Sequence, residues 1–171
     1  MAGFTAAGIA FDTVTNESSA GADDASQLAP LGFELTRQSP TADEGLQTWI
    51  YVKANGALTA GMVVGRGDSV STYSDVIPAA TTTGIPGVVG VCVHAIGDNG
   101  YGFILKKGVC SVVAGTGTID DNEAIIVDST DAGTAMRATS GAGVSTDAGF
   151  GFAHADAAAT ASASCYINCT G

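Results

Sequence analysis

The chain has 171 residues, of which 46% are hydrophobic and only 13% are charged, about half the charged share of an average soluble domain. Acidic residues outnumber basic residues by 17 to 6, which gives a formal net charge of −11 at pH 7. Direct binding to nucleic acid or to an anionic membrane is therefore not expected, because both need a basic protein surface.

Residues 1–31 carry little regular pattern, and we expect them to form an extended N-terminal arm. Three apolar side chains, Phe4, Ile9 and Phe11, stand in a stretch that is otherwise rich in Ala, Gly and polar residues. We expect these three residues to dock the arm on another surface; simple disorder is the competing interpretation of the same composition. The chain start lacks the features of a secretory signal peptide, and no apolar run approaches the length of a membrane-spanning helix. We therefore expect synthesis in a cytoplasm.

From residue 32 the sequence favours β-strands. Residues 32–37 alternate apolar and polar side chains, and residues 46–54 are rich in aromatic and β-branched ones. Asn55–Gly56 then predicts a tight hairpin turn followed by a short return strand. The Ser- and Thr-rich stretch 68–86 is expected to be a long surface loop.

Residues 97–115, GDNGYGFILKKGVCSVVAG, follow a buried-looking strand and are expected to turn at DNG and run back beside it. Gly102 is expected to permit close packing or a bulge, and Gly108 to form a bulge or a bend. Lys106 and Lys107 are expected at a rim where the strand meets solvent. They are candidate contacts to an acidic partner, and an edge pair that prevents aggregation is the alternative.

Further strands are expected at 123–129, 150–157 and 164–170, with an Ala-rich stretch between the last two that is either a helix or a plain connection. The whole pattern predicts an all-β fold, a small barrel or sandwich of about eight short strands with long loops rich in Gly, Ser and Thr. We expect one domain over residues 32–171 behind the arm.

A short internal echo joins residues 57–69 and 118–130. Each segment runs from an aliphatic residue through a turn into a β-branched run, and then reaches Asp and Ser. Two similar β units fit a barrel, but the match is too short to define a repeat.

Catalytic motifs are missing from the sequence. It holds no nucleophile elbow, no zinc-protease or phosphate-loop motif and no dinucleotide fingerprint. We therefore expect no enzymatic activity, no cofactor and no metal. His94 and His154 are interpreted as structural, and the acidic group around Asp120 and Asp121 as a turn. The cysteines are expected to be buried thiols, namely Cys92, Cys110, Cys165 and Cys169.

The triplet Arg66–Gly67–Asp68 matches the Arg-Gly-Asp sequence of cell-adhesion ligands. A guanidinium and a carboxylate separated by a flexible glycine can bridge a receptor carboxylate and its metal ion. A Gly-Asp turn after a strand explains the triplet equally well. It remains the basis of an alternative function, a receptor-binding or adhesive module such as a head fibre or tail-associated protein.

The order of elements from Gln47 to Gly171 resembles that of the small β-rich capsid decoration, or cement, proteins of tailed bacteriophages. The resemblance rests on GVVGV at 87–91, GYG at 100–102, the GV step at 108–109 and STDAG at 129–133. It also includes the closing stretch GFGFAHADAAATASASCYINCTG, in which GFAHADA stands where the family usually has G-x-A-L-E-A.

This resemblance implies a structural protein of the virion, located on the outer capsid surface. It implies the major capsid protein and further copies of the chain, as a homotrimer, as partners. Such proteins clamp neighbouring capsid subunits through several modest contacts whose combined avidity is high.

Overall fold

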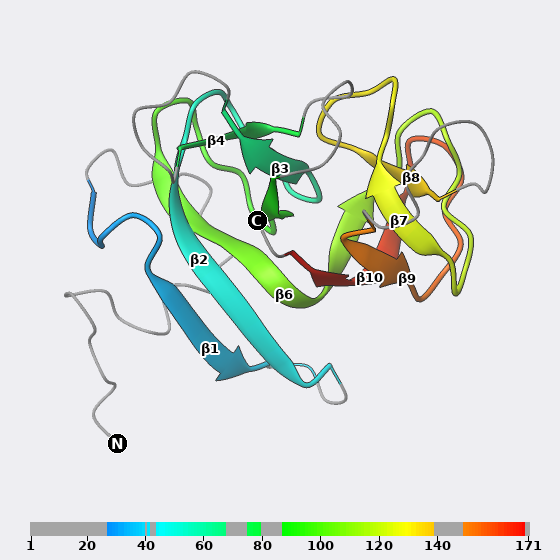
Figure 1. Cartoon of the computed structure of the whole chain (residues 1–171), viewed down its shortest axis with the longest axis horizontal. Helices are drawn as coiled ribbons and strands as arrows, with labels where there is room; N and C mark the ends of the chain where they lie inside the picture. Colours follow the sequence, from blue (N-terminus) through cyan, green and yellow to red (C-terminus); the bar gives the residue numbers. More distant parts are fainter. Residues whose placement is uncertain are drawn as a thin grey trace.

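The computed structural model describes residues 27–39, 41, 44–67, 75–79, 87–138 and 149–169, and within these ranges it is all-β, without a helix. The strands form one hydrogen-bonded sheet that folds onto itself (Figure 1). Their bounds are β1 (Glu34–Gln38), β2 (Leu46–Ala54), β3 (Val63–Arg66), β4 (Asp75–Pro78), β5 (Val88–Val91), β6 (Tyr101–Val113), β7 (Ala124–Val127), β8 (Ala135–Arg137), β9 (Gly151–Ala153) and β10 (Ser162–Asn168). The predicted barrel of short strands is confirmed.

The first half of the sheet closes into a five-stranded barrel. Its strands follow the order β2-β4-β3-β5-β6, and β6 returns to pair with β2 in antiparallel register, with Tyr51 opposite Phe103. The β2–β4 pair is parallel, and the other neighbours are antiparallel. The barrel is filled by apolar side chains of alternating strand positions, among them Val52, Val64 and Ile104, which are not exposed at all. Strand β1 lies outside this ring, and among the described strands it pairs only with β2.

A second ring uses the far half of β6. Strands β10, β9, β7 and β8 follow β6 in order, and a parallel bridge between Ala114 and Ala135 returns β8 to the end of β6. This bridge corresponds to the parallel β2–β4 pair of the first barrel. In Figure 1, β3 and β4 lie on one side of the molecule, β7 to β10 lie on the other, and β6 spans the two.

The two rings repeat the same local structure. Bridges join Leu58 to Ile96 in the first and Ile119 to Ala157 in the second, and the partners correspond at a distance of 61 positions (119 minus 58, 157 minus 96). Each bridge residue is followed by a turn with a hydrogen bond from residue i+3 to residue i and a positive φ at its third position. These third positions are Gly61 (82°), Asn99 (62°), Asn122 (61°) and Thr160 (65°).

A close backbone approach is duplicated as well. Gly90 in β5 lies against the carbonyl oxygen of Leu105, and Gly151 in β9 lies against the carbonyl oxygen of Tyr166. A Cβ atom at either glycine would overlap that oxygen, so both sites require glycine. The echo between residues 57–69 and 118–130 is thus part of a structural repeat that covers both barrels.

The tight hairpin predicted at Asn55–Gly56 is wrong. Strand β3 pairs with β4 and β5 and not with β2. The turn instead directs the chain across the barrel end, where the Asn55 amide donates to the Val76 carbonyl (2.8 Å) and the Gly56 amide to Asp98 Oδ1 (2.8 Å).

One further expectation needs correction, and one open alternative is decided. The stretch 68–86, predicted as a loop throughout, contains β4, whose Val76 is fully buried. Residues 154–161 form turns and a bridge, so the Ala-rich stretch is the connection between β9 and β10 and not a helix. The structure also adds β8 in a segment where the small side chains gave no strand signal.

Candidate contact surface at the barrel junction

The lysine pair lies where β6 passes from one barrel to the other. The register between β6 and β2 is interrupted there, because Thr48 is opposite Lys107 while Trp49 is opposite Leu105. Lys106 is therefore the extra residue of a β-bulge. Gly108 was the predicted bulge position; it has a φ of 132° and lies against Gln47, so the backbone irregularity extends to it.

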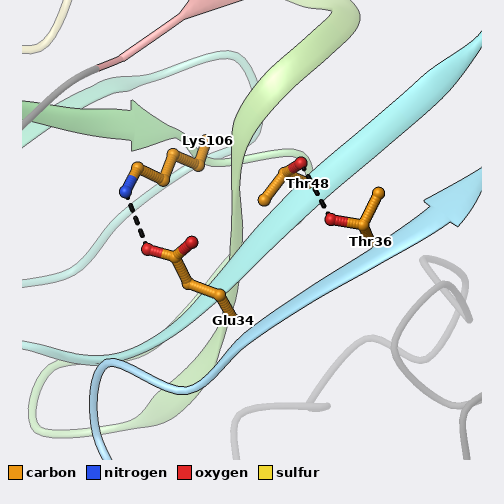
Figure 2. Close-up of polar contacts among 4 residues, drawn as sticks. All are labelled: Glu34, Thr36, Thr48 and Lys106. Carbon is orange, nitrogen blue, oxygen red and sulfur yellow. Dashed lines mark hydrogen bonds and ion pairs between the residues drawn. The ribbon is translucent and has the colours of Figure 1, made fainter.

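The bulge brings Lys106 to the β1 strand (Figure 2). Its Nζ lies 2.7 Å from Glu34 Oε1, with side-chain exposures of 22% and 44%. Beside it, Thr36 and Thr48 are cross-strand partners whose hydroxyl oxygens lie 3.1 Å apart. An exposed ion pair of this kind stabilises a protein by about 1 kcal/mol or less, so its main effect is to fix the position of the Lys106 side chain.

Lys107 remains exposed on the same face as Thr48, since directly opposed residues of paired strands point to the same side. No ion pair of Lys107 is found in the part of the chain that the structure describes. Leu46, at the start of β2, is 61% exposed on this face. We call this surface the junction face; its residues are Glu34, Thr36, Gln38, Leu46, Thr48, Lys106 and Lys107.

A second exposed feature, which the sequence analysis missed, is an aromatic cluster on the second barrel. Phe152 is 42% exposed. Its ring centroid lies 4.9 Å from that of His154 and 5.3 Å from that of Tyr166. The signal that could have indicated it is the two-residue spacing of Phe152 and His154, which places both on the exposed side of β9, opposite buried Ala153.

Of the other predicted contact residues, the structure describes Arg66 and Gly67. Phe4, Ile9 and Phe11 lie outside the described residues, as does Asp68 of the adhesive triplet. Arg66 ends β3 and is half-buried, and the Gly67 amide donates to the Asp75 carbonyl (3.4 Å).

The prediction of buried thiols is confirmed for three of the four cysteines, whereas Cys110 is half-buried. Burial raises the pKa of Cys92 and Cys169 to about 12 and that of Cys165 to about 11, and these thiols therefore stay protonated and unreactive at neutral pH. His154 lies on the surface beside Phe152, and His94 lies in a bend after β5 rather than in a strand.

Neither a metal-binding cluster nor a membrane-spanning helix occurs among the described residues. No three His, Cys, Asp or Glu side chains among them are grouped so as to hold a metal ion. No helix in this part of the chain has the length and apolar character needed to cross a membrane.

No family model and no curated protein matches the chain. Among solved structures, the N base of the head fibre protein gp8.5 of bacteriophage phi29 has a similar fold. The TM-score is 0.52 at 15% sequence identity, and the match covers 71% of this chain and 93% of that chain. At this identity the likeness is one of fold.

Proposed function

We propose that this chain is a structural protein of a bacteriophage head, bound to the outer surface of the capsid. The supporting observation is the fold shared with the N base of a phage head fibre over 71% of this chain. The chemistry of the described residues agrees with such a role, because three of their four cysteines are buried and the polar groups of the junction face form surface contacts.

The junction face is the proposed contact with the capsid. Lys107 is exposed in a chain with only six basic residues, and Leu46 adds an apolar contact beside it. This combination fits a capsid surface that carries a carboxylate next to an apolar patch. In the clamp version of the function, several copies, arranged as a homotrimer, hold neighbouring major capsid subunits together through such contacts.

A second version follows from the fold shared with the base of a phage head fibre. In it, the two barrels are the capsid-bound base of a fibre, and the host-directed part lies elsewhere in the assembly. The versions differ in phenotype: loss of a clamp lowers the temperature at which heads release DNA, whereas loss of a fibre base leaves this temperature unchanged and slows adsorption to host cells.

The shared proposal is tested by electron microscopy of intact particles at a resolution that separates strands. We expect density for two five-stranded barrels linked by one long strand on the outside of the head. Heads that contain no such density would refute the proposal for both versions.

Reversing the charge at Lys107 is expected to weaken capsid binding. For Lys107→Glu we predict a loss of affinity for purified heads of about tenfold, with a smaller salt dependence than in the wild type, because the attraction to an acidic patch becomes a repulsion. Binding is measured by co-sedimentation with heads at several salt concentrations.

The matched control is Lys53→Glu, which makes the same change in charge on β2 but away from the junction face. If both variants bind heads as tightly as the wild type, or if both lose affinity to the same extent, the junction face is not the contact.

A further inference from the structure

On the side of the β1–β2 pair opposite the junction face lies a partly open polar cavity of about 220 Å³. That volume equals about seven water molecules at about 30 Å³ each, which is room for a ring-sized ligand. The lining combines β1, β2, described residues of the connection between them, one residue that follows β5 and the far half of β6: Arg37, Ser39, Thr41, Glu44, Gln47, Trp49, Val93, Val109 and Cys110.

Two deeply buried side chains of this lining have polar atoms without a partner. Trp49 is 1% exposed, and its Nε1 has no hydrogen-bond partner among the described residues. Gln47 is 7% exposed, and its Oε1 lacks a partner in the same part of the chain. An unsatisfied buried donor and an unsatisfied buried acceptor are each costly, so their presence at one cavity indicates a group that normally satisfies both.

The charges of the lining narrow the choice of ligand. Arg37 lies over the Trp49 ring, with its Cζ 6.0 Å from the ring centroid, and supplies the positive charge. Glu44 supplies a negative charge, and its Oε2 accepts a hydrogen bond from Ser39 Oγ (2.6 Å). Because the two formal charges cancel, the cavity does not favour an anion such as phosphate or a carboxylate.

We propose that this cavity binds a neutral, hydroxyl-rich ligand, a single ring of a saccharide. A hydroxyl group can accept a hydrogen bond from the indole N–H of Trp49 and donate one to the Gln47 carbonyl oxygen. A sugar ring presents several such groups at once, together with C–H edges that can contact Val93 and Val109. The cavity and the junction face lie on opposite sides of the same strands, so this proposal does not depend on docking at a capsid.

The chain contains a single tryptophan, which makes the test direct. In ¹⁵N-labelled protein, the indole N–H of Trp49 gives one isolated resonance that reports on the cavity. We expect it to shift saturably when the methyl glycosides of glucose, galactose or N-acetylglucosamine are added one at a time. A Kd on the order of 1 mM is expected for at least one of them, because one small ring makes few contacts.

Two variants test the assigned groups. Gln47→Met removes the carbonyl at nearly constant volume, and Trp49→Phe removes the indole N–H; each is expected to weaken binding of the same glycoside by about tenfold or more. Backbone amide shifts follow binding in Trp49→Phe, and circular dichroism verifies that each variant is folded. Thr48→Val, on the same strand but facing the junction face, is the control and should bind like the wild type.

The alternatives have separate outcomes. Inorganic phosphate and acetamide serve as the anionic and the amide probe. If either shifts the Trp49 resonance saturably while no glycoside does, the ligand class is wrong. If no probe shifts it at concentrations well above 1 mM, water alone fills the cavity and the proposal is overturned.

Discussion

Replacing Gly90 with alanine is expected to destabilise the protein by about 3 kcal/mol or more, and Gly151→Ala is expected to do the same. The reason is that the new Cβ atom would overlap the carbonyl oxygen of Leu105 in the first case and that of Tyr166 in the second. Backbone atoms of paired strands cannot move aside without breaking the sheet. Urea unfolding followed by circular dichroism measures the loss.

Gly149→Ala is the matched control for these two variants. A Cβ atom there comes no closer than 3.5 Å to another atom, the Ile125 carbonyl oxygen, which is an ordinary contact. We expect its stability to remain within about 0.5 kcal/mol of the wild type. If Gly90→Ala or Gly151→Ala is as stable as this control, the duplicated strand contact does not exist as described.

The second large effect is expected at Asp128, a carboxylate that is only 1% exposed at the end of β7. Its Oδ1 accepts hydrogen bonds from the Thr130 amide (2.6 Å) and hydroxyl (2.9 Å), and its Oδ2 accepts one from the Gly117 amide (3.2 Å). In Asp128→Asn an NH₂ group replaces one of these oxygens and faces donors instead of accepting from them. We expect a loss of about 2 kcal/mol at pH 7, measured by urea unfolding.

The pH dependence provides a second test of Asp128. Burial disfavours its charged form, but the hydrogen bonds from Thr130, Gly117 and Asp131 outweigh burial, so its pKa lies below the ordinary value of 3.8. A lowered pKa means that the carboxylate contributes its full stability above the ordinary value and loses it as the pH falls through the folded-state pKa. The stability difference between wild type and Asp128→Asn should therefore be largest at neutral pH and shrink below about pH 4.

The neighbouring Asp131→Asn is the control, because it removes the same charge from the same loop without removing these side-chain hydrogen bonds. It should change stability by less than about 0.5 kcal/mol at pH 7. Equal losses in the two variants would show that net charge and not the Asp128 hydrogen bonds causes the effect. A difference that does not depend on pH would show that the ionised form of Asp128 is not its source.

The candidate surface could be predicted only in part from the sequence. Lys106 and Lys107 were predicted at a strand rim because two adjacent cations in an otherwise apolar strand are a local signal. Their neighbours on the junction face come from β1 and the start of β2, some sixty to seventy positions earlier in the chain, and no local pattern relates them. The cavity could not be predicted for the same reason. In the sequence Trp49 has the pattern of an ordinary strand residue, and only the fold places side chains of the distant strand β6 beside it.

The sequence by itself determined the all-β class and the places of most strands, because alternation, β-branching and turn residues act over a few neighbouring positions. It also contained the echo between residues 57–69 and 118–130. Only the tertiary structure decided which strands pair, and thereby that the echo belongs to two barrels with one shared strand. Strand pairing depends on contacts between distant segments: Asn55–Gly56 favours a hairpin locally, but its amides bond to Val76 and Asp98 instead. The need for glycine at Gly90 and Gly151 likewise follows only from the carbonyl oxygens that distant strands place beside them.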